Sequence, residues 1–224
     1  MQMKRKKHSI VFLVVLACSI MGFVDAIIQP GYVIKSAIKI LLFLFSPILY
    51  AHFDGECNLK GLLTPKKGVK IAVLSGVGVY AIILSAFLIL RDVFDFSAVI
   101  TSLSSSTGVT KSNFIWVALY ISFVNSLLEE FFFRGFAFFT LKDVSSRMFS
   151  YIFSSAAFAL YHVSMMIGWF GMELTSLAIA GLTTGGILFN LCNEKSGNIY
   201  LSWLIHMFAN FAINTVGFIL FYSV

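Results

Sequence analysis

Seven stretches of about 20 mostly apolar residues follow one another along the chain, and they constrain its fold more than any other feature. A helix needs about 20 such residues to cross a bilayer, and only helices and closed barrels satisfy their backbone hydrogen bonds in lipid. We therefore predict an all-α, polytopic transmembrane helix bundle of about seven spans. The expected spans are 9–28, 31–51, 69–90, 114–141, 149–170, 174–192 and 199–222.

Charged residues make up 12% of the chain, about half the share found in soluble domains. We therefore expect a single membrane domain, with N-terminal helices and loops in 1–113 and a core in 114–224. Two connectors are long, 52–68 and 91–113. The second carries a serine-rich segment and is predicted to be a flexible loop.

The net charge of +6 comes from basic clusters beside the apolar runs. This placement is typical of the positive-inside rule and does not indicate a nucleic-acid partner. An N-terminus in the cytosol puts eleven of the sixteen Lys and Arg residues inside: Lys4, Arg5, Lys6, Lys7, Lys60, Lys66, Lys67, Lys70, Lys142, Arg147 and Lys195. We therefore predict a cytosolic N-terminus and a bacterial plasma membrane, with the endoplasmic reticulum left open. The first run resembles a signal peptide, but we expect it to be retained as a helix.

Ionisable residues inside the expected spans are costly to insert and usually functional. The fourth span carries Glu129, Glu130 and Arg134 in the sequence EEFFFR. Glu130 and Arg134 lie four residues apart, in the order that favours an ion pair on a helix. That pair leaves Glu129 to point elsewhere, and two carboxylates against one cation leave a surplus charge. The surplus favours a function over mere packing.

Two later spans each carry a further polar motif. Phe158 and His162 lie in FALYH, and His206 and Asn210 lie in HMFAN. With a rise of about 1.5 Å per residue, His162, His206 and Asn210 lie about 20, 10 and 16 Å from the expected cytosolic helix ends, and Glu129 about 18 Å. The similar depths predict a shared polar cavity. Taken singly, these residues also fit interhelical hydrogen bonds made for packing.

A fourth polar group consists of Asp25, Lys35 and Lys39, near the outer ends of the first two spans. Lysines in such places reach the interface with their ammonium groups. We therefore expect these three residues to have little functional weight.

Together and in this order, the three motifs resemble those of the CAAX protease and bacteriocin-processing family of intramembrane peptidases (CPBP, also called Abi). The resemblance covers roughly residues 114–222, and Phe138 matches an aromatic position four residues after Arg134. It implies an intramembrane endopeptidase that hydrolyses a peptide bond of a membrane-associated protein or peptide, CAAX-protease-like, in contact with the lipid bilayer. The implied catalytic residues are Glu129, His162, His206 and Asn210, supported by Glu130, Arg134 and Phe158.

The chemistry leaves alternatives open. Glu129 can accept a proton from water and return it to the leaving amine, without a metal. Glu129, His162 and His206 also form a plausible zinc set, and members of the family are often labelled metalloproteases, so the cofactor is either none or one divalent metal. A non-catalytic bacteriocin-immunity or binding protein is the main rival. A proton-coupled transporter is the other, since the Gly-rich run 181–186 predicts either a broken helix or close packing.

Overall fold

The structure is a computed structural model that describes residues 2–64, 68–94, 96, 99, 101, 104–105, 108–167 and 170–222. Within these ranges the chain is helical and contains no β-strand. Parts of two predictions lie outside the described residues. These are the basic residues Lys66 and Lys67, and Ser102, Ser106 and Thr107 of the predicted loop.

The helices follow one another in long, nearly continuous segments, several of which change between α-helical and π-helical turns. Their bounds are α1 (Gln2–Phe23), η1 (Val24–Ile28), α2 (Tyr32–Ile40), η2 (Leu41–Phe45), α3 (Ser46–Asp54), η3 (Lys60–Leu63), α4 (Val69–Leu90), α6 (Phe114–Tyr120), η4 (Ile121–Asn125), α7 (Ser126–Glu129), η5 (Glu130–Thr140), α8 (Leu141–Val144), α9 (Arg147–Met166), α10 (Met172–Ser196) and α11 (Tyr200–Tyr222). η3 is a 3₁₀-helix, and η1, η2, η4 and η5 are π-helices.

Six segments of the described chain are long and apolar enough to cross a membrane: Gln2–Ile28, Tyr32–Asp54, Val69–Leu90, Phe114–Val144, Met172–Ser196 and Tyr200–Tyr222. The remaining expected span, 149–170, corresponds to α9. This helix has 20 residues but carries four serines, two tyrosines and a histidine. These polar side chains lower its hydropathy, and it packs against α1, η5, α8 and α10. The prediction of an all-α membrane bundle of about seven spans is confirmed.

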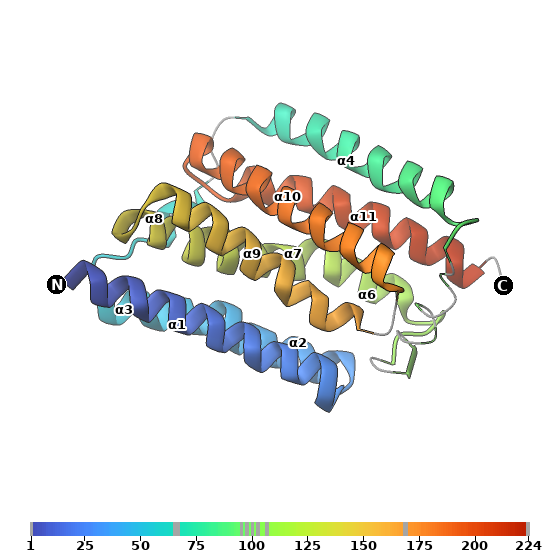
Figure 1. Cartoon of the computed structure of the whole chain (residues 1–224), viewed down its shortest axis with the longest axis horizontal. Coiled ribbons are helices and arrows are strands. Elements are labelled where there is room, and N and C mark those ends of the chain that lie inside the picture. The colour runs from blue at the N-terminus through green and yellow to red at the C-terminus, as the bar shows by residue number, and fades with distance from the viewer. Residues whose placement is uncertain are drawn as a thin grey trace.

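The long helices lie side by side and alternate in direction (Figure 1). α1, α2 and α3 form one edge of the bundle, α4 forms the opposite edge against α11, and the segment Phe114–Val144 runs between them with α9, α10 and α11. The two ends of the chain lie at opposite ends of the bundle (Figure 1). This arrangement agrees with an odd number of crossings.

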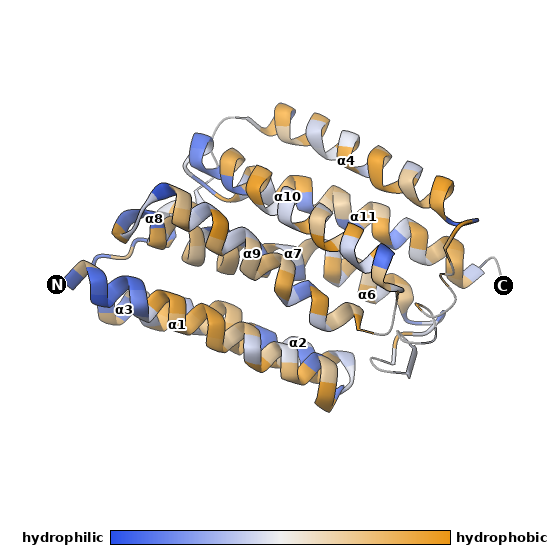
Figure 2. Ribbon diagram, viewed as in Figure 1, coloured by the Kyte–Doolittle hydropathy of each residue, from blue (hydrophilic) through white to orange (hydrophobic). Residues whose placement is uncertain are grey.

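The end of the bundle that holds the start of α1 is the hydrophilic one, and α8 and the end of α10 lie there too (Figure 2). Glu194 at this end accepts hydrogen bonds from Arg147 at 2.7 Å and from Tyr151 at 2.6 Å, which joins α10 to the start of α9. Lys6 of α1 pairs with Asp54 of α3 at 3.0 Å. The basic residues therefore gather as the positive-inside pattern requires, and a cytosolic location for this end remains a prediction.

Aromatic rings fill the interior around the segment Phe114–Val144. Phe43 of η2 stacks on Phe132 with ring centres 4.1 Å apart, and it meets Tyr161 of α9 edge to face. The Ser154 hydroxyl of α9 donates to the backbone carbonyl of Phe133 at 2.8 Å. These contacts fix η5 between the N-terminal helices and α9, and so place the adjacent acidic residues in the interior.

The Gly-rich run 181–186 does not break its helix, because α10 continues through it from Met172 to Ser196. A Cβ atom added to Gly186 would lie 3.1 Å from the Cα atom of Ser155 on α9. The glycine therefore permits close packing of α9 and α10, and the interpretation as a broken transporter helix is wrong.

Candidate active site

Glu129 and Glu130 lie where α7 passes into η5, on a stretch of helix that is buried on every side. All residues from Leu128 to Phe138 are buried, and the exposed fractions of Glu129 and Glu130 are 1% and 0%. π-helical turns are rare in proteins, but those that occur are often found at functional sites. Here the π-helices η4 and η5 lie on either side of α7. Since neither carboxylate reaches water, each needs partners from neighbouring helices.

Glu129 uses its two oxygens differently. Its Oε1 atom accepts hydrogen bonds from the Lys39 ammonium at 2.5 Å and from the Asn125 side-chain amide at 3.0 Å. Its Oε2 atom lies 3.6 Å from Nε2 of His162 and 3.7 Å from Nε2 of His206. Helices α2, α9 and α11 therefore converge on one carboxylate, as the similar depths predicted for the two histidines.

Glu130 points to a different set of partners. The Arg134 guanidinium lies 3.1 Å from Oε1, which confirms the predicted ion pair, and Nδ1 of His206 lies 2.9 Å from the same oxygen. The Ser202 hydroxyl donates to Oε2 at 2.5 Å and itself accepts from the Asn193 amide at 2.7 Å. Glu130 is thus fixed by its own helix, by α11 and, through Ser202, by α10.

Arg134 is completely buried, and aromatic faces complete its surroundings. The centre of its guanidinium lies 4.0 Å from the ring centre of Phe158 and 5.0 Å from that of Phe189. A guanidinium over an aromatic face gains cation–π attraction, most strongly where water is excluded. The Phe158 ring also lies 4.5 Å from the His162 ring and 5.9 Å from the His206 ring. The Phe158 ring therefore lies beside Arg134 and both imidazoles.

The hydrogen bonds fix the orientation of each imidazole. Nδ1 of His162 lies 2.7 Å from the carbonyl oxygen of Phe158, which can only accept, so this nitrogen carries the hydrogen. Nδ1 of His206 donates to the Glu130 carboxylate in the same way. Nε2 of each ring therefore faces Oε2 of Glu129.

Asn210, one turn beyond His206, donates from its amide to the Ile121 carbonyl at 3.1 Å. Among the described residues, no hydrogen bond joins it to Glu129, His162 or His206. The amide has a second N–H group. Asn210 therefore adjoins the cluster along α11 without being tied into it.

Lys39 is the main residue that the sequence prediction missed. It was expected to reach the interface, but it is 5% exposed and contacts Glu129 in the interior, so that expectation is wrong. The predicted surplus of negative charge is also wrong, because Lys39 neutralises Glu129 as Arg134 neutralises Glu130. Buried Asp25 and partly buried Lys35 form a separate ion pair at 2.8 Å.

The donor set does not fit a divalent metal. Among the described residues, no group of three His, Cys, Asp or Glu side chains is arranged to hold one. Oε1 of Glu129 already contacts the ammonium group of Lys39, which supplies the positive charge that a metal would otherwise bring. These contacts favour proton transfer over metal binding as the role of Glu129, His162 and His206.

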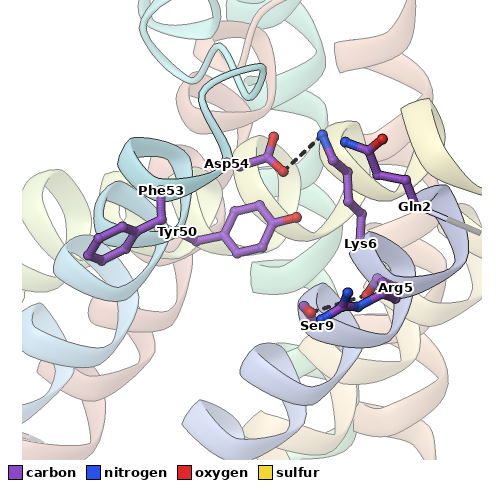
Figure 3. A pocket seen from close by; sticks show the side chains of 7 residues that line it. All are labelled: Gln2, Arg5, Lys6, Ser9, Tyr50, Phe53 and Asp54. Carbon is purple, nitrogen blue, oxygen red and sulfur yellow. Dashed lines mark hydrogen bonds and ion pairs between the residues drawn. The ribbon is translucent and has the colours of Figure 1, made fainter.

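A cavity of about 620 Å³ lies elsewhere, between the first turns of α1 and the last turn of α3 (Figure 3). The ion pair between Lys6 and Asp54 crosses it, and Tyr50 and Phe53 line its apolar side. It opens at the basic end of the bundle and includes none of the residues around Glu129. It is not the candidate active site.

Comparison with known proteins adds one finding. Residues 111–212, somewhat less than half of the chain, match the Rce1-like family, described as type II CAAX prenyl endopeptidase Rce1-like. No curated protein and no solved structure matches the chain. The matched segment contains Glu129, Glu130, Arg134, His162 and His206, with Asn210. The resemblance of the three motifs to the CAAX protease (CPBP) family is thereby confirmed over the matched residues, and the apolar helices indicate a membrane-embedded protein.

Proposed function

We propose that this protein is an intramembrane endopeptidase in which Glu129 activates the water that attacks a peptide bond. The observation that carries the proposal is the convergence of Oε2 of Glu129 with Nε2 of both His162 and His206 in the interior of a segment that matches a peptidase family. With both imidazoles neutral, all three atoms accept hydrogen bonds. Three acceptors do not bind one another. They fit a molecule that donates hydrogens, and water is the smallest such molecule.

The distances support a bridging water. Separations of 3.6 and 3.7 Å are too long for direct hydrogen bonds, and polar contacts beyond about 3.5 Å are often bridged by one water molecule. A water held by Oε2 of Glu129 and Nε2 of His162 would have its oxygen lone pairs free for attack.

Glu129 Oε2 takes one proton from the water as its oxygen bonds to the scissile carbonyl carbon. The same proton passes to the amide nitrogen as the C–N bond breaks, which releases an amine and a carboxylic acid that keeps the second hydrogen of the water. The remaining N–H of Asn210 donates to the oxyanion formed in between. Glu130 and Arg134 hold His206 in place.

The proposed substrate is a membrane-associated protein or peptide, because the cluster lies in the middle of spanning helices and only a chain held in the bilayer reaches it. A CAAX-like C-terminal substrate is the first to test, since the matched family is described by that activity. The proposed location is a bacterial plasma membrane.

Cleavage by purified protein tests this proposal. The wild type, Glu129→Gln and the control Glu173→Gln are incubated in detergent with a prenylated CAAX peptide and a library of membrane peptides, with and without a strong chelator. Glu173 is an exposed acid at the start of α10. Mass spectrometry should find new termini with the wild type and the control, unaffected by the chelator, and none with Glu129→Gln. Equal cleavage by Glu129→Gln would refute the mechanism, and inhibition by the chelator would restore the metal alternative.

A non-catalytic immunity or binding protein is the second candidate. The observation in its favour is charge balance: Lys39 and Arg134 neutralise both carboxylates, as they would in a cluster that only holds the helices together. A protection assay separates the two functions. It measures the survival of cells exposed to a bacteriocin when they express the wild type or Glu129→Gln. Protection that survives the substitution would favour binding over catalysis.

A further inference from the structure

Lys39 contacts the proposed catalytic base although it lies outside the segment that matches the peptidase family. It belongs to the last turn of α2, whereas the family match begins at residue 111. Its ammonium donates to Glu129 Oε1 at 2.5 Å and to the Asn125 side-chain oxygen at 2.6 Å. The N-terminal helices therefore supply a contact that the matched segment does not contain.

Lys39, Asn125 and Glu129 form a closed triangle of hydrogen bonds. The Asn125 amide donates to the same Glu129 oxygen, at 3.0 Å, as the ammonium does. A carboxylate held at one oxygen by a charged donor and a neutral donor cannot turn freely about its last bond. Oε2 therefore remains directed at His162 and His206.

Within the described part of the chain, Lys39 has one anionic partner, Glu129. Its ammonium lies 4.9 Å from the ring centre of Tyr161 and 5.5 Å from that of Phe43, so aromatic faces cover its other side. Lys35, one turn earlier on α2, pairs with Asp25 at 2.8 Å. The two lysines thus form two separate ion pairs on one helix, and only that of Lys39 includes Glu129.

We propose that Lys39 is a positioning residue for the peptidase reaction, which holds Glu129 so that Oε2 rather than Oε1 takes the proton from water. This inference rests on the proposed function. It assigns to the N-terminal helices a direct part in the geometry of the active site. Lys39 does not touch the substrate in this account, so its removal should lower kcat and leave KM nearly unchanged.

The test measures kcat, KM and thermal unfolding in detergent for the wild type, Lys39→Met, Lys39→Arg and Lys35→Met, on one cleaved peptide. Displacement of a reacting group by about 1 Å can cost about 10²-fold in rate. We expect Lys39→Met to lose about 10²-fold in kcat with KM within about twofold of the wild type. Lys39→Arg keeps the charge and the donors and should recover part of the rate. Lys35→Met is the control, because it breaks the ion pair between Lys35 and Asp25 on the same helix. It should reduce thermal stability while leaving kcat of the folded enzyme unchanged.

Asn125→Leu provides a second route if Lys39→Met does not fold, because it opens the triangle without leaving an unpaired charge. It should lower kcat less than Lys39→Met does, again at nearly constant KM. Wild-type kcat in Lys39→Met or Asn125→Leu would overturn the inference while leaving the peptidase in place, and so would equal losses of kcat in Lys39→Met and Lys35→Met. Absence of cleavage by the wild type would overturn the proposed function and this inference together.

Discussion

Replacement of Arg134 by Met tests how the interior holds its charges. Arg134 is fully buried, its NH1 atom lies 3.1 Å from Glu130 Oε1, and the Phe158 ring covers its guanidinium at 4.0 Å. Met has a similar length and can fill the space between the aromatic rings. The substitution therefore removes the charge with little change of shape and leaves Glu130 as a buried anion without its cation.

Breaking a buried ion pair on one side typically costs about 3–5 kcal/mol. Glu130 keeps its hydrogen bonds from Ser202 and His206, so we expect the lower end, about 3 kcal/mol. At about 1.4 kcal/mol for each factor of ten, this is about a 10²-fold loss in the ratio of folded to unfolded protein. The double variant Glu130→Gln/Arg134→Met removes both charges and should regain about 2 kcal/mol relative to Arg134→Met.

Reversible unfolding in mixed detergent micelles with increasing denaturing detergent measures these free energies. The wild type, the two single variants and the double variant form one thermodynamic cycle. A free energy of unfolding for Arg134→Met within about 0.5 kcal/mol of the wild type, or a double variant no more stable than Arg134→Met, would refute the account of a coupled buried pair.

The remaining predictions concern the helix contacts around the site. Gly186→Ala should destabilise the bundle by about 1–3 kcal/mol because the new methyl group meets the backbone of Ser155, whereas Gly185→Ala has no neighbour within 4 Å and should be neutral or slightly stabilising in the same unfolding assay. Ser202→Ala should cost about 1–3 kcal/mol because Glu130 Oε2 loses its buried donor; a wild-type unfolding midpoint for this variant would contradict that role.

The sequence predicted the spans well because lipid imposes a minimum length on apolar helices. It also predicted that Glu129, His162 and His206 lie close together, because polar groups at similar depth on packed helices contact one another rather than lipid. The Glu130–Arg134 pair followed from helix geometry alone. The polarity of α9 was not anticipated, since a helix enclosed by α1, η5, α8 and α10 can carry serines that donate to its neighbours.

Lys39 was missed for a reason that the sequence itself could have corrected. It lies twelve residues from the end of the expected span 31–51, about 18 Å deep, which is the same depth as Glu129. The depth argument that joined the acids and histidines therefore applied to Lys39 too. No sequence feature predicted the π-helical turns of η4 and η5, because the apolar residues there do not recur at a clear helical spacing.

The central claim is that Glu129, rather than its neighbour Glu130, is the base. The direct measurement compares kcat on one cleaved peptide, together with thermal stability, for Glu129→Gln and Glu130→Gln. General base catalysis contributes about 10²–10⁴-fold in rate, so Glu129→Gln should lose that much while remaining folded. Glu130→Gln should show the greater loss of stability and the smaller loss of kcat. A larger loss of kcat in Glu130→Gln, with Glu129→Gln still active, would contradict the account.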